Sequence, residues 1–280
     1  MNFTAARSWA SQQLRGRSDS PQLEAEILLC HVLGIDRVSL YSRPETVVAP
    51  LQLSQFEQLI AQRCDGYPVA YQLGYQEFWS MKLGVSPEVL IPRADTELLV
   101  EKALDLVPQD QPCRVLELGT GSGAIALALA HERPAASIVA TDISRAALDV
   151  AKENARTHDL SQIKFVHSNW FDELGQQVFD LILSNPPYVA ADDPHLAAGV
   201  SRYEPELAVL AAAQGLAALT AIIRDADAYL EPQGHLLLEH GWQQREAVVE
   251  LMRCNGFTDI LTHADLAGHP RVTNGTCNHG

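Results

Sequence analysis

The sequence predicts an α/β fold in which a doubly wound, Rossmann-like parallel sheet follows a small helical N-terminal domain. Three observations support this prediction. Apolar strand-like runs alternate with amphipathic helical segments from residue 93 onward, a glycine-rich turn joins the first of these strands to a helix, and the first 74 residues show only helical periodicity. We therefore expect domains at residues 1–74 and 93–280, joined by a hairpin connector at 75–92.

The composition describes a globular chain that is large enough for an extensive hydrophobic core. Of its 280 residues, 47% are hydrophobic and 20% are charged, with a formal net charge of −15. No apolar run approaches the roughly 18 residues of a membrane span, and the first residues lack the order of a signal peptide. We therefore expect a cytoplasmic monomer without a membrane partner. The acidic charge argues against direct binding of nucleic acid, because basic residues supply most of that affinity.

The cysteines and histidines predict neither disulfides nor a metal site. Five cysteines are scattered without a Cys-x-x-Cys pair, and the ten histidines show no spacing typical of metal ligands. We expect reduced thiols and no bound metal.

The helical N-terminal segment carries two signals for the start of a helix. Ser20 is a good N-cap, Pro21 suits the first helical position, and apolar residues recur at helical spacing up to Gly34. Ser54 and Glu57 match a capping box for a later helix. No catalytic constellation occurs here, so we interpret this domain as a packing or substrate-recognition module.

The pattern changes in the connector. Aromatic and β-branched residues at 75–85 are closed by Pro87 and Pro92, which predicts a hairpin between the two domains. Asp95 then precedes an apolar helical run at 98–106. Its carboxylate suits the N-cap of that helix, and a place in the lining of a cofactor pocket is the alternative.

Strands and helices alternate through the rest of the chain, which is typical of a parallel, doubly wound sheet. The apolar runs predict strands at 114–118, 137–141, 163–167, 179–184, 234–239 and 258–263. Amphipathic segments predict helices at 124–131, 144–158, 215–229 and 243–255. The last residues, 271–280, begin like a final strand and then become polar, so we expect a frayed terminus.

A glycine-rich turn joins the first strand to its helix. The turn comprises Gly119, Thr120, Gly121, Ser122 and Gly123. Glycines permit a tight turn and let a ligand approach the backbone at a helix N-terminus, although the spacing also fits a dinucleotide fingerprint. Asp142 follows 23 residues after Gly119 and is placed to accept both hydroxyls of a ribose, with capping of the next helix as its alternative role.

Three features favour S-adenosylmethionine over a nicotinamide dinucleotide. Glu117 precedes the glycines, where it attracts a positively charged methionine end and would repel a pyrophosphate. Trp170 follows the third strand, where its ring can cover an adenine, with packing in the core as the alternative. The first and fourth strands of a doubly wound sheet are neighbours, so the glycine-rich turn and the segment after residue 184 end side by side.

Asn185-Pro186-Pro187-Tyr188 follows the fourth strand and predicts an amine-binding loop. Neither proline has a backbone N–H, and each holds the preceding residue in an extended conformation. The Asn185 side-chain oxygen and the Pro186 carbonyl can then accept the two N–H groups of an amide or ring amine, which orients its lone pair. Tyr188 is placed to stack on a planar group or to face a cation. A purely structural turn is the alternative for this loop.

These motifs together resemble the protein-(glutamine-N5) methyltransferase family of the PrmC/HemK type, which modifies class 1 peptide chain release factors. The resemblance covers nearly the whole chain and includes Glu77-Phe78-Trp79-Ser80. Asn-Pro-Pro-Tyr alone is shared with methyltransferases that act on adenine in DNA and on guanine in ribosomal RNA. The segments that point to the release-factor branch are Pro92-Arg93-Ala94-Asp95-Thr96-Glu97 and Glu239-His240-Gly241.

The resemblance implies a class I methyltransferase fold with S-adenosylmethionine as the cofactor. It implies that the amide of the glutamine in the release factor's Gly-Gly-Gln motif is held by Asn185, Pro186, Pro187 and Tyr188, of which Asn185, Pro186 and Tyr188 are catalytic. The methyl group would pass directly to the amide nitrogen, without a covalent enzyme intermediate or a metal. The cofactor would contact Glu117, Gly119, Thr120, Gly121, Ser122, Gly123, Asp142, Trp170 and Asn185.

One segment departs from the family pattern, and three alternative functions remain to be tested. Ala211-Ala212-Ala213-Gln214 stands where the family is expected to show paired glycines and an acidic residue. The alternatives are methylation of an exocyclic amine in nucleic acid, hydride transfer with a nicotinamide cofactor, and non-catalytic binding of S-adenosylmethionine. The acidic charge opposes the first, Glu117 opposes the second, and turnover would exclude the third.

Overall fold

The computed structural model describes residues 1–190 and 202–278. The chain forms two compact units, Met1–Tyr75 and Gln76–Gly280, each with a hydrophobic core of its own. Within the described ranges, no helix combines the length and the apolar character that a membrane crossing requires.

The N-terminal unit is entirely helical apart from one isolated β-bridge. Its helices are α1 (Phe3–Leu14), α2 (Pro21–Leu33), α3 (Arg37–Ser42), α4 (Pro50–Cys64) and α5 (Val69–Leu73). Leu14, Leu28, Leu29, Leu40 and Phe56 are fully buried at the centre of this unit.

Of the two predicted helix starts in this unit, the one at Ser20 and Pro21 is confirmed and the one at Ser54 is wrong. Ser20 does occupy the N-cap of α2, with Pro21 in the first turn, but its side chain makes no capping hydrogen bond. The capping box of Ser54 and Glu57 is wrong, because α4 already begins at Pro50 and both residues lie inside the helix. Proline fixes a helical φ at the first position, so it starts the helix without a side-chain cap.

The connector forms a two-stranded hairpin, β1 (Tyr75–Phe78) and β2 (Met81–Gly84). Its two turn residues, Trp79 and Ser80, have φ values of 50° and 58°, as a tight primed turn requires. The Trp79 backbone N–H donates to Glu97 Oε1 at 2.8 Å, and its indole N–H donates to Glu132 Oε1 at 2.9 Å. These two bonds attach the hairpin to the helices that carry Glu97 and Glu132.

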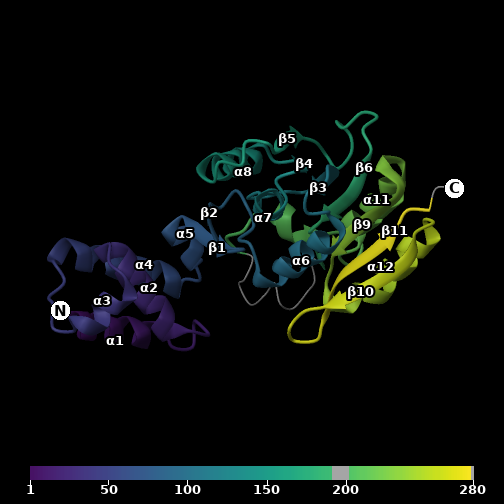
Figure 1. The fold of residues 1–280 in the computed structure, drawn as a ribbon. Coiled ribbons are helices and arrows are strands. Elements are labelled where there is room, and N and C mark those ends of the chain that lie inside the picture. The colour runs from purple at the N-terminus through teal and green to yellow at the C-terminus, as the bar shows by residue number, and fades with distance from the viewer. Residues whose placement is uncertain (191–201, 279–280) are drawn as a thin grey trace. The chain divides into compact units, whose positions relative to one another are not determined.

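A seven-stranded sheet of order β10-β11-β9-β6-β3-β4-β5 forms the centre of the C-terminal unit (Figure 1). The strands are β3 (Cys113–Leu118), β4 (Ala136–Asp142), β5 (Lys164–His167), β6 (Phe179–Ser184), β9 (Leu230–Glu239), β10 (Thr258–Ala264) and β11 (Pro270–Thr276). The five strands from β5 to β9 run parallel, whereas β11 is antiparallel to both of its neighbours. The predicted doubly wound α/β fold is therefore confirmed, with an antiparallel hairpin added at one edge.

Helices and short elements connect these strands. They are η1 (Ala94–Thr96), α6 (Glu97–Leu106), α7 (Ala124–Glu132), α8 (Arg145–Thr157), β7 (Val189–Ala190), α10 (Glu206–Val209), β8 (Leu210–Ala211), α11 (Ala217–Ala226), η2 (Asp227–Tyr229), η3 (Trp242–Gln244) and α12 (Arg245–Cys254). Asp95 lies inside η1, and the N-cap position of α6 is held by Thr96, so the prediction of Asp95 as the cap is wrong.

The prediction of a frayed, polar C-terminus is also wrong as far as Thr276. The strand β11 pairs with β9 on one side and with β10 on the other, so its backbone groups are satisfied from both sides. Its polar Thr273 is fully buried, and the hydroxyl lies 2.8 Å from His240 Nε2 and 2.9 Å from Thr262 Oγ1. Hydrogen bonding across the sheet therefore compensates for the polar composition of this strand.

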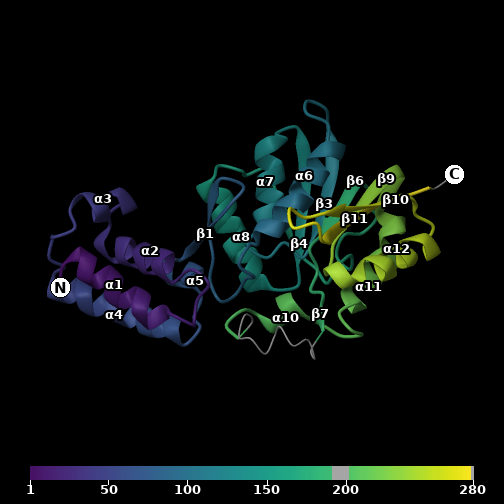
Figure 2. The same ribbon diagram turned by 90° about the horizontal axis from the view of Figure 1, so that it is seen from below.

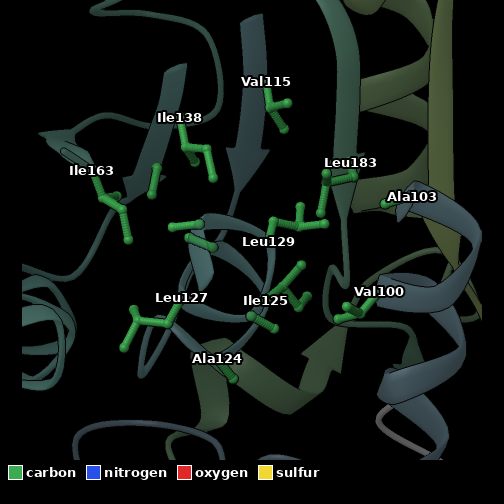
Figure 3. Close-up of a cluster of buried hydrophobic side chains, with 14 of the residues drawn as sticks. Val100, Ala103, Val115, Ala124, Ile125, Leu127, Leu129, Ile138, Ile163 and Leu183 are labelled. Carbon is green, nitrogen blue, oxygen red and sulfur yellow. The ribbon is translucent and has the colours of Figure 1, made fainter. Parts of the chain in front are cut away.

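Helices cover both faces of the sheet. Figure 2 shows α6 and α7 on one side and α11 and α12 on the other. Alternate strand residues face the two layers, since Val115 and Leu183 pack with α7 (Figure 3), whereas Leu116 and Ile182 pack with α11. Each buried strand is therefore apolar along its length, and the sheet provides a rigid platform for the loops at its edge.

The predicted neighbourhood of the first and fourth strands is confirmed. The strand β3 pairs with β6 in parallel, and their last residues, Leu118 and Ser184, are register partners. The Ser184 hydroxyl donates to the Leu118 carbonyl at 2.7 Å, which ties the two strand ends together. Gly119 and Asn185 therefore begin adjacent loops at the carboxyl edge of the sheet.

Candidate active site

The glycine-rich turn at residues 119–123 packs against the helices that follow it. A Cβ atom on Gly123 would lie 2.6 Å from Leu127 Cδ1 and 3.2 Å from Ala151 Cβ, and the residue has a φ of 84°. Only glycine fits such a position without strain. Thr120 and Ser122 in the same turn are buried, at 5% and 3% exposure. The turn is therefore held in one conformation at the amino end of α7.

Glu117 places a carboxylate beneath this turn. It is 1% exposed, and its Oε2 accepts hydrogen bonds from Thr120 Oγ1 at 2.6 Å and from the Ala126 N–H at 3.1 Å. Its Oε1 is buried and has no hydrogen-bond partner among the described residues. Burial raises the pKa of Glu117 to about 8, although the two hydrogen bonds oppose the rise. A buried carboxylate oxygen without a partner fits a cationic group or a water molecule bound beside the turn.

Asp142 closes the other side of the turn. Its Oδ2 accepts a hydrogen bond from the Gly121 N–H at 2.9 Å, and its Oδ1 accepts one from the Ser144 N–H at 2.8 Å. The helix cap itself is Ser144, whose hydroxyl accepts the Ala147 N–H at 3.2 Å. The Ile143 N–H is a third backbone donor to this carboxylate, and a carboxylate offers about four acceptor positions in all, so capacity remains for a ribose hydroxyl.

Trp170 lies over the glycine-rich turn. An added Cβ on Gly119 would be 3.7 Å from Trp170 Cζ3, and the tryptophan backbone adopts a left-handed φ of 48°. The Ser168 hydroxyl donates to the Trp170 carbonyl at 2.9 Å and supports this unusual conformation. The ring is partly buried against the hydrophobic core, so it combines packing with a place beside the turn.

Asn185 is oriented by a contact from a distant part of the chain. Its Nδ2 donates to Thr96 Oγ1 at 3.1 Å, across 89 residues of sequence. The Asn185 side chain is half-buried, and Pro186 behind it is buried. With the NH2 group directed at Thr96, the oxygen Oδ1 points the other way and remains an acceptor. In the described ranges, no hydrogen-bond donor to this oxygen is found.

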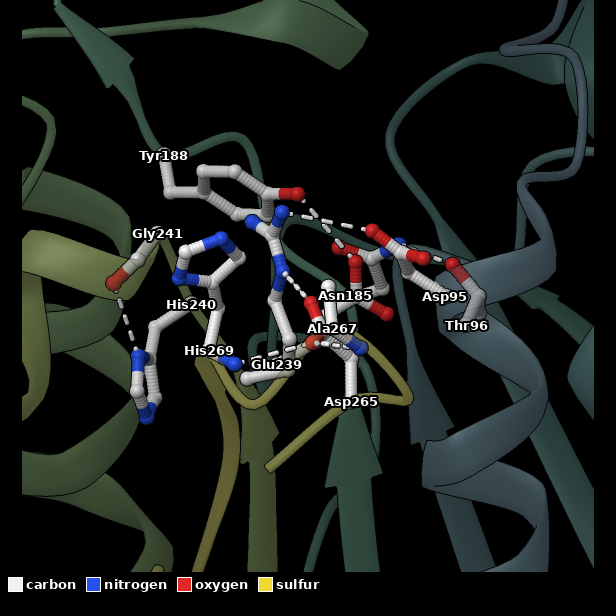
Figure 4. Close-up of polar contacts among 11 residues, drawn as sticks. Asp95, Thr96, Asn185, Tyr188, Glu239, His240, Gly241, Asp265, Ala267 and His269 are labelled. Carbon is white, nitrogen blue, oxygen red and sulfur yellow. Dashed lines mark hydrogen bonds and ion pairs between the residues drawn. The ribbon is translucent and has the colours of Figure 1, made fainter. Parts of the chain in front are cut away.

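Tyr188 is held at both ends, by the last residue of β9 and by a residue that follows this strand. Its hydroxyl lies 3.2 Å from Glu239 Oε1 (Figure 4), and its carbonyl accepts a hydrogen bond from Gln244 Nε2 at 3.0 Å. Burial and the neighbouring Glu239 carboxylate both raise the pKa of Tyr188, so the phenol stays protonated at neutral pH. The tyrosine is therefore a fixed wall of the loop and a hydrogen-bond donor to Glu239.

Glu239 is a second buried carboxylate at the sheet edge, with 1% exposure. Burial raises its pKa to about 7, while Thr96, Tyr188 and Arg271 stabilise the ionised form. Arg271 in turn forms ion pairs with Asp265 at 3.0 Å and with Asp95 at 3.3 Å. These side chains converge on one polar cluster beside Asn185 (Figure 4).

The segment that departs from the family pattern lies directly against Tyr188. Ala213 and Gln214 have φ values of 54° and 57°, the left-handed region that favours glycine. A Cβ on the following Gly215 would lie 2.2 Å from the Tyr188 carbonyl oxygen. The backbone therefore keeps a glycine-type conformation at positions 213 and 214, even though neither residue there is glycine.

Several residues of the site have no local sequence pattern that indicates a role. The predicted loop is contacted by Thr96, Glu239 and Gln244. Separately, Glu204 accepts hydrogen bonds from the Ile91 N–H at 3.1 Å and from Arg93 Nη2 at 2.5 Å. Thr96 and Glu239 stand inside the two segments that point to the release-factor branch of the resembling family. Their place in these two segments is the sequence feature that could have identified Thr96 and Glu239. Contacts between segments far apart in sequence leave no local pattern.

Comparison with known proteins identifies relatives along nearly the entire chain. Family models match the PrmC N-terminal domain over residues 5–74 and the methyltransferase small domain over residues 94–201. A release factor glutamine methyltransferase of Salmonella typhimurium is 48% identical over 275 residues, which cover 98% of this chain and 99% of the relative. The proteins of that name from Escherichia coli and Coxiella burnetii are 47% and 44% identical, over 92% and 94% of this chain and 93% and 94% of theirs.

A solved structure shares part of the fold of this chain. A methyltransferase from Pyrococcus furiosus superposes with a TM-score of 0.54, covering 71% of this chain and 90% of that chain. Its sequence identity is 15%, so the likeness concerns the fold alone.

Proposed function

The chain belongs to the family of release factor glutamine methyltransferases, and from this premise we propose its reaction. It transfers a methyl group from S-adenosylmethionine to the side-chain amide nitrogen of the glutamine in the Gly-Gly-Gln motif of class 1 peptide chain release factors. The observation that carries this assignment is the orientation of Asn185. Its amide NH2 is engaged by Thr96 at 3.1 Å, so its carbonyl oxygen is the group offered to a substrate N–H.

The residues around the glycine-rich turn fit S-adenosylmethionine. The unpartnered, buried Oε1 of Glu117 suits the ammonium group of the methionine end, directly or through water. Asp142 suits the ribose hydroxyls, and Trp170 suits the adenine. The cofactor would lie against the backbone of the glycine-rich turn, which comprises Gly119, Thr120, Gly121, Ser122 and Gly123. When bound, this cofactor supplies an electrophilic methyl group on a positively charged sulfur.

The loop after β6 prepares the glutamine nitrogen for attack. An amide nitrogen is a poor nucleophile because its lone pair is delocalised into the carbonyl. Asn185 Oδ1 and the Pro186 carbonyl accept the two N–H groups, which orients the nitrogen and favours the geometry with a localised lone pair. Pro187 stiffens the loop, and Tyr188 forms its wall. S-adenosylmethionine, when bound, would supply the methyl group to this nitrogen, which would then release one proton to solvent.

The reaction is therefore catalysed by positioning and by acceptor hydrogen bonds. Glu117 and the acceptor oxygens of the loop would hold the cofactor and the amide in place, and this positioning, rather than stabilisation of a developing charge, would lower the barrier. No side chain is needed as a base before the bond forms, because the proton leaves only after the methylated nitrogen has become acidic.

The helical unit at residues 1–74 recognises the protein substrate in this proposal. It matches the PrmC N-terminal domain and contains no part of the Asn185 loop. The release factor supplies the partner surface, which suits a chain whose net charge of −15 opposes binding to nucleic acid. We propose that the protein acts in the cytoplasm as a monomer.

The experiment that tests the proposal compares Asn185→Ala with the wild type on an unmodified class 1 release factor. We expect kcat to fall about 100-fold or more, the scale of losing one preorganised hydrogen-bonding group at a reacting centre. Affinity for S-adenosylmethionine, measured by calorimetry, should change less than about tenfold, and the thermal unfolding midpoint should stay near that of the wild type. Asn278→Ala is the control, since Asn278 is exposed near the C-terminus. An Asn185→Ala variant that keeps its kcat would disprove the assigned role.

A further inference from the structure

Gln244 makes side-chain hydrogen bonds with main-chain groups of three separate segments. Its Oε1 accepts the Gly241 N–H at 2.9 Å, just after β9. Its Nε2 donates to the Tyr188 carbonyl at 3.0 Å, on the loop after β6, and to the Gln214 carbonyl at 3.3 Å, in the turn after β8. A half-buried glutamine therefore connects the end of a central strand with the predicted amine-binding loop.

The direction of these three hydrogen bonds is fixed by the chemistry of the main chain. A main-chain N–H can only donate and a main-chain carbonyl can only accept, so a single orientation of the Gln244 amide satisfies all three partners. The reversed amide would place its NH2 group against an N–H and its oxygen against two carbonyls, and would lose all three hydrogen bonds. The Gly241 carbonyl also accepts the Gln244 main-chain N–H at 2.8 Å. Gln244 therefore forms a connection of defined geometry.

The Tyr188 carbonyl is enclosed on a second side by Gly215. A Cβ atom added to Gly215 would lie 2.2 Å from the Tyr188 carbonyl oxygen and 2.5 Å from Gln244 Nε2, so no larger residue fits without moving one of them. Ala213 and Gln214, which precede this glycine, keep left-handed φ values of 54° and 57°. Residues other than glycine hold such conformations where the surrounding contacts determine them. The turn therefore meets the Tyr188 carbonyl in one fixed arrangement.

The loop that follows β6 has little conformational freedom of its own. Its first end is fixed by the hydrogen bond of 2.7 Å from the Ser184 hydroxyl to the end of β3. Pro186 and Pro187 each lock one backbone torsion, and each restricts the residue before it. A shift of the Tyr188 main chain is therefore passed on to the Pro186 carbonyl and to Asn185, because few torsions between them can absorb it.

We propose that Gln244 is a positioning residue, which fixes the carboxyl end of the Asn185 loop and so places the Pro186 carbonyl, the second acceptor for the substrate NH2 group. The inference rests on the proposed function, since it concerns the same methyl acceptor. If the Tyr188 main chain moves, the two acceptors no longer match the two N–H groups, and the nitrogen lone pair turns away from the methyl donor. A main-chain carbonyl cannot be removed by substitution, so its contribution is tested through the side chain that holds it.

The first test compares Gln244→Glu with Gln243→Glu in methyl transfer to an intact release factor. Both variants add one negative charge at neighbouring positions, and Gln243 is exposed, so it is the matched control. In Gln244→Glu the ionised carboxylate still accepts the Gly241 N–H, but its second oxygen faces two carbonyls without a proton to donate. We expect kcat of this variant to fall about 10- to 100-fold, as misplacement at a reacting centre does. Gln243→Glu should keep the kcat of the wild type.

The readouts separate positioning from stability. The rate is expressed per S-adenosylmethionine-binding site, counted by calorimetry, so a partly unfolded sample does not lower it. The affinity for S-adenosylmethionine should change little, because the glycine-rich turn is unaltered. The KM for the release factor should also change little, because the loop binds one side chain of a large protein substrate. Gln244→Met gives the same comparison without a new charge if Gln244→Glu does not fold.

The second test reaches the same carbonyl from its other side. Gly215→Ala places a methyl group against the Tyr188 carbonyl, and we expect kcat per cofactor-binding site to fall about tenfold or more. Gly256→Ala is the control, because Gly256 has a similar φ of 87°, against 84° at Gly215, but an added Cβ there meets nothing within 4 Å. Both variants introduce the same kind of backbone strain, so both should lose stability, and only Gly215→Ala should lose kcat.

The outcomes distinguish this inference from the proposed function. If the wild type does not methylate the release factor, the proposed function fails first. If the wild type is active and either Gln244→Glu or Gly215→Ala retains its kcat, the positioning role is wrong. An equal loss of kcat in Gln243→Glu or Gly256→Ala, or a loss confined to the KM for the release factor, would overturn the role as well.

Discussion

The buried carboxylate of Glu117 predicts a variant that stabilises the fold and weakens the cofactor site. Glu117→Gln keeps an acceptor for Thr120 and for the Ala126 N–H, while an NH2 group replaces the unpartnered Oε1. The variant removes an ionisation whose pKa is raised from 4.5 to about 8 by burial. We therefore expect its stability relative to the wild type to depend on pH.

The sign follows from the direction of the shift. The folded state binds the Glu117 proton more tightly than the unfolded chain, so this contribution to stability is complete below pH 4.5 and is lost as pH rises to about 8. The free energy of unfolding of the wild type falls by about 1.4 kcal/mol per pH unit over this window from this group alone. Between pH 4.5 and pH 8, Glu117 therefore lowers the free energy of unfolding by at most on the order of 5 kcal/mol. Glu117→Gln should therefore be more stable than the wild type by a few kcal/mol at pH 8 and about equal to it near pH 4.5.

Urea unfolding followed by tryptophan fluorescence measures this difference at pH 5, 6, 7 and 8. Glu88→Gln is a matched control in the same unit, because Glu88 is exposed. Calorimetry should show a loss of affinity for S-adenosylmethionine of about tenfold or more in Glu117→Gln, since the ammonium group loses its counter-charge. A stability difference that is the same at pH 5 and pH 8 would refute the description of Glu117 as a buried carboxylate with a raised pKa.

Two further predictions concern the loop beside Tyr188 and the second buried carboxylate. Ala213→Gly and Gln214→Gly should each raise the free energy of unfolding by up to about 1 kcal/mol in urea titrations, because both residues adopt a left-handed φ that suits glycine. A decrease in the free energy of unfolding would show that the backbone at these positions is unstrained. The pH profile of kcat should fall on the acid side of about pH 7, because Glu239 with its raised pKa becomes protonated there and can no longer act only as an acceptor toward Tyr188, which forms the wall of the Asn185 loop. Glu239→Gln should lack this limb, and a variant that keeps it would assign the titration to another group.

The parallel part of the fold could be predicted from sequence because its strands are buried on both faces. Residues 179–184 read as an apolar run, and the glycine-rich turn after residue 118 marks where a strand gives way to a helix. The rule that places ligands at the switch point of a doubly wound sheet then brings Gly119 and Asn185 together, as the pairing of β3 with β6 confirms.

At the antiparallel edge, the strand β10 was predicted at residues 258–263 and the beginning of β11 was predicted too, but the continuation of β11 to Thr276 and its pairing between β9 and β10 were not. The strand β11 contains Thr273, Asn274 and Thr276, whose polar side chains indicate a terminus rather than an interior strand. Their burial is stable only because β9 and β10 satisfy the backbone on both sides and His240 and Thr262 satisfy Thr273. Such partners are known only once the tertiary structure is known.

The side chains that contact the Asn185 loop from distant parts of the sequence could not be predicted either. The loop of Asn185 was predicted from its prolines, but the hydrogen bond from its side chain to Thr96 joins residues 89 positions apart. Asp95 suited a helix cap by its type and position, whereas the structure pairs it with Arg271 on β11. Local patterns predict which backbone elements form, and the side chains that connect distant elements are decided by packing.

The most direct test of the account is to locate the methyl group. The protein is incubated with S-adenosylmethionine and an unmodified class 1 release factor, and tandem mass spectrometry of peptides then identifies the modified atom. Our account predicts one added methyl group on the side-chain nitrogen of the glutamine in the Gly-Gly-Gln motif. A methyl group on another residue, or transfer to nucleic acid in place of the release factor, would contradict it.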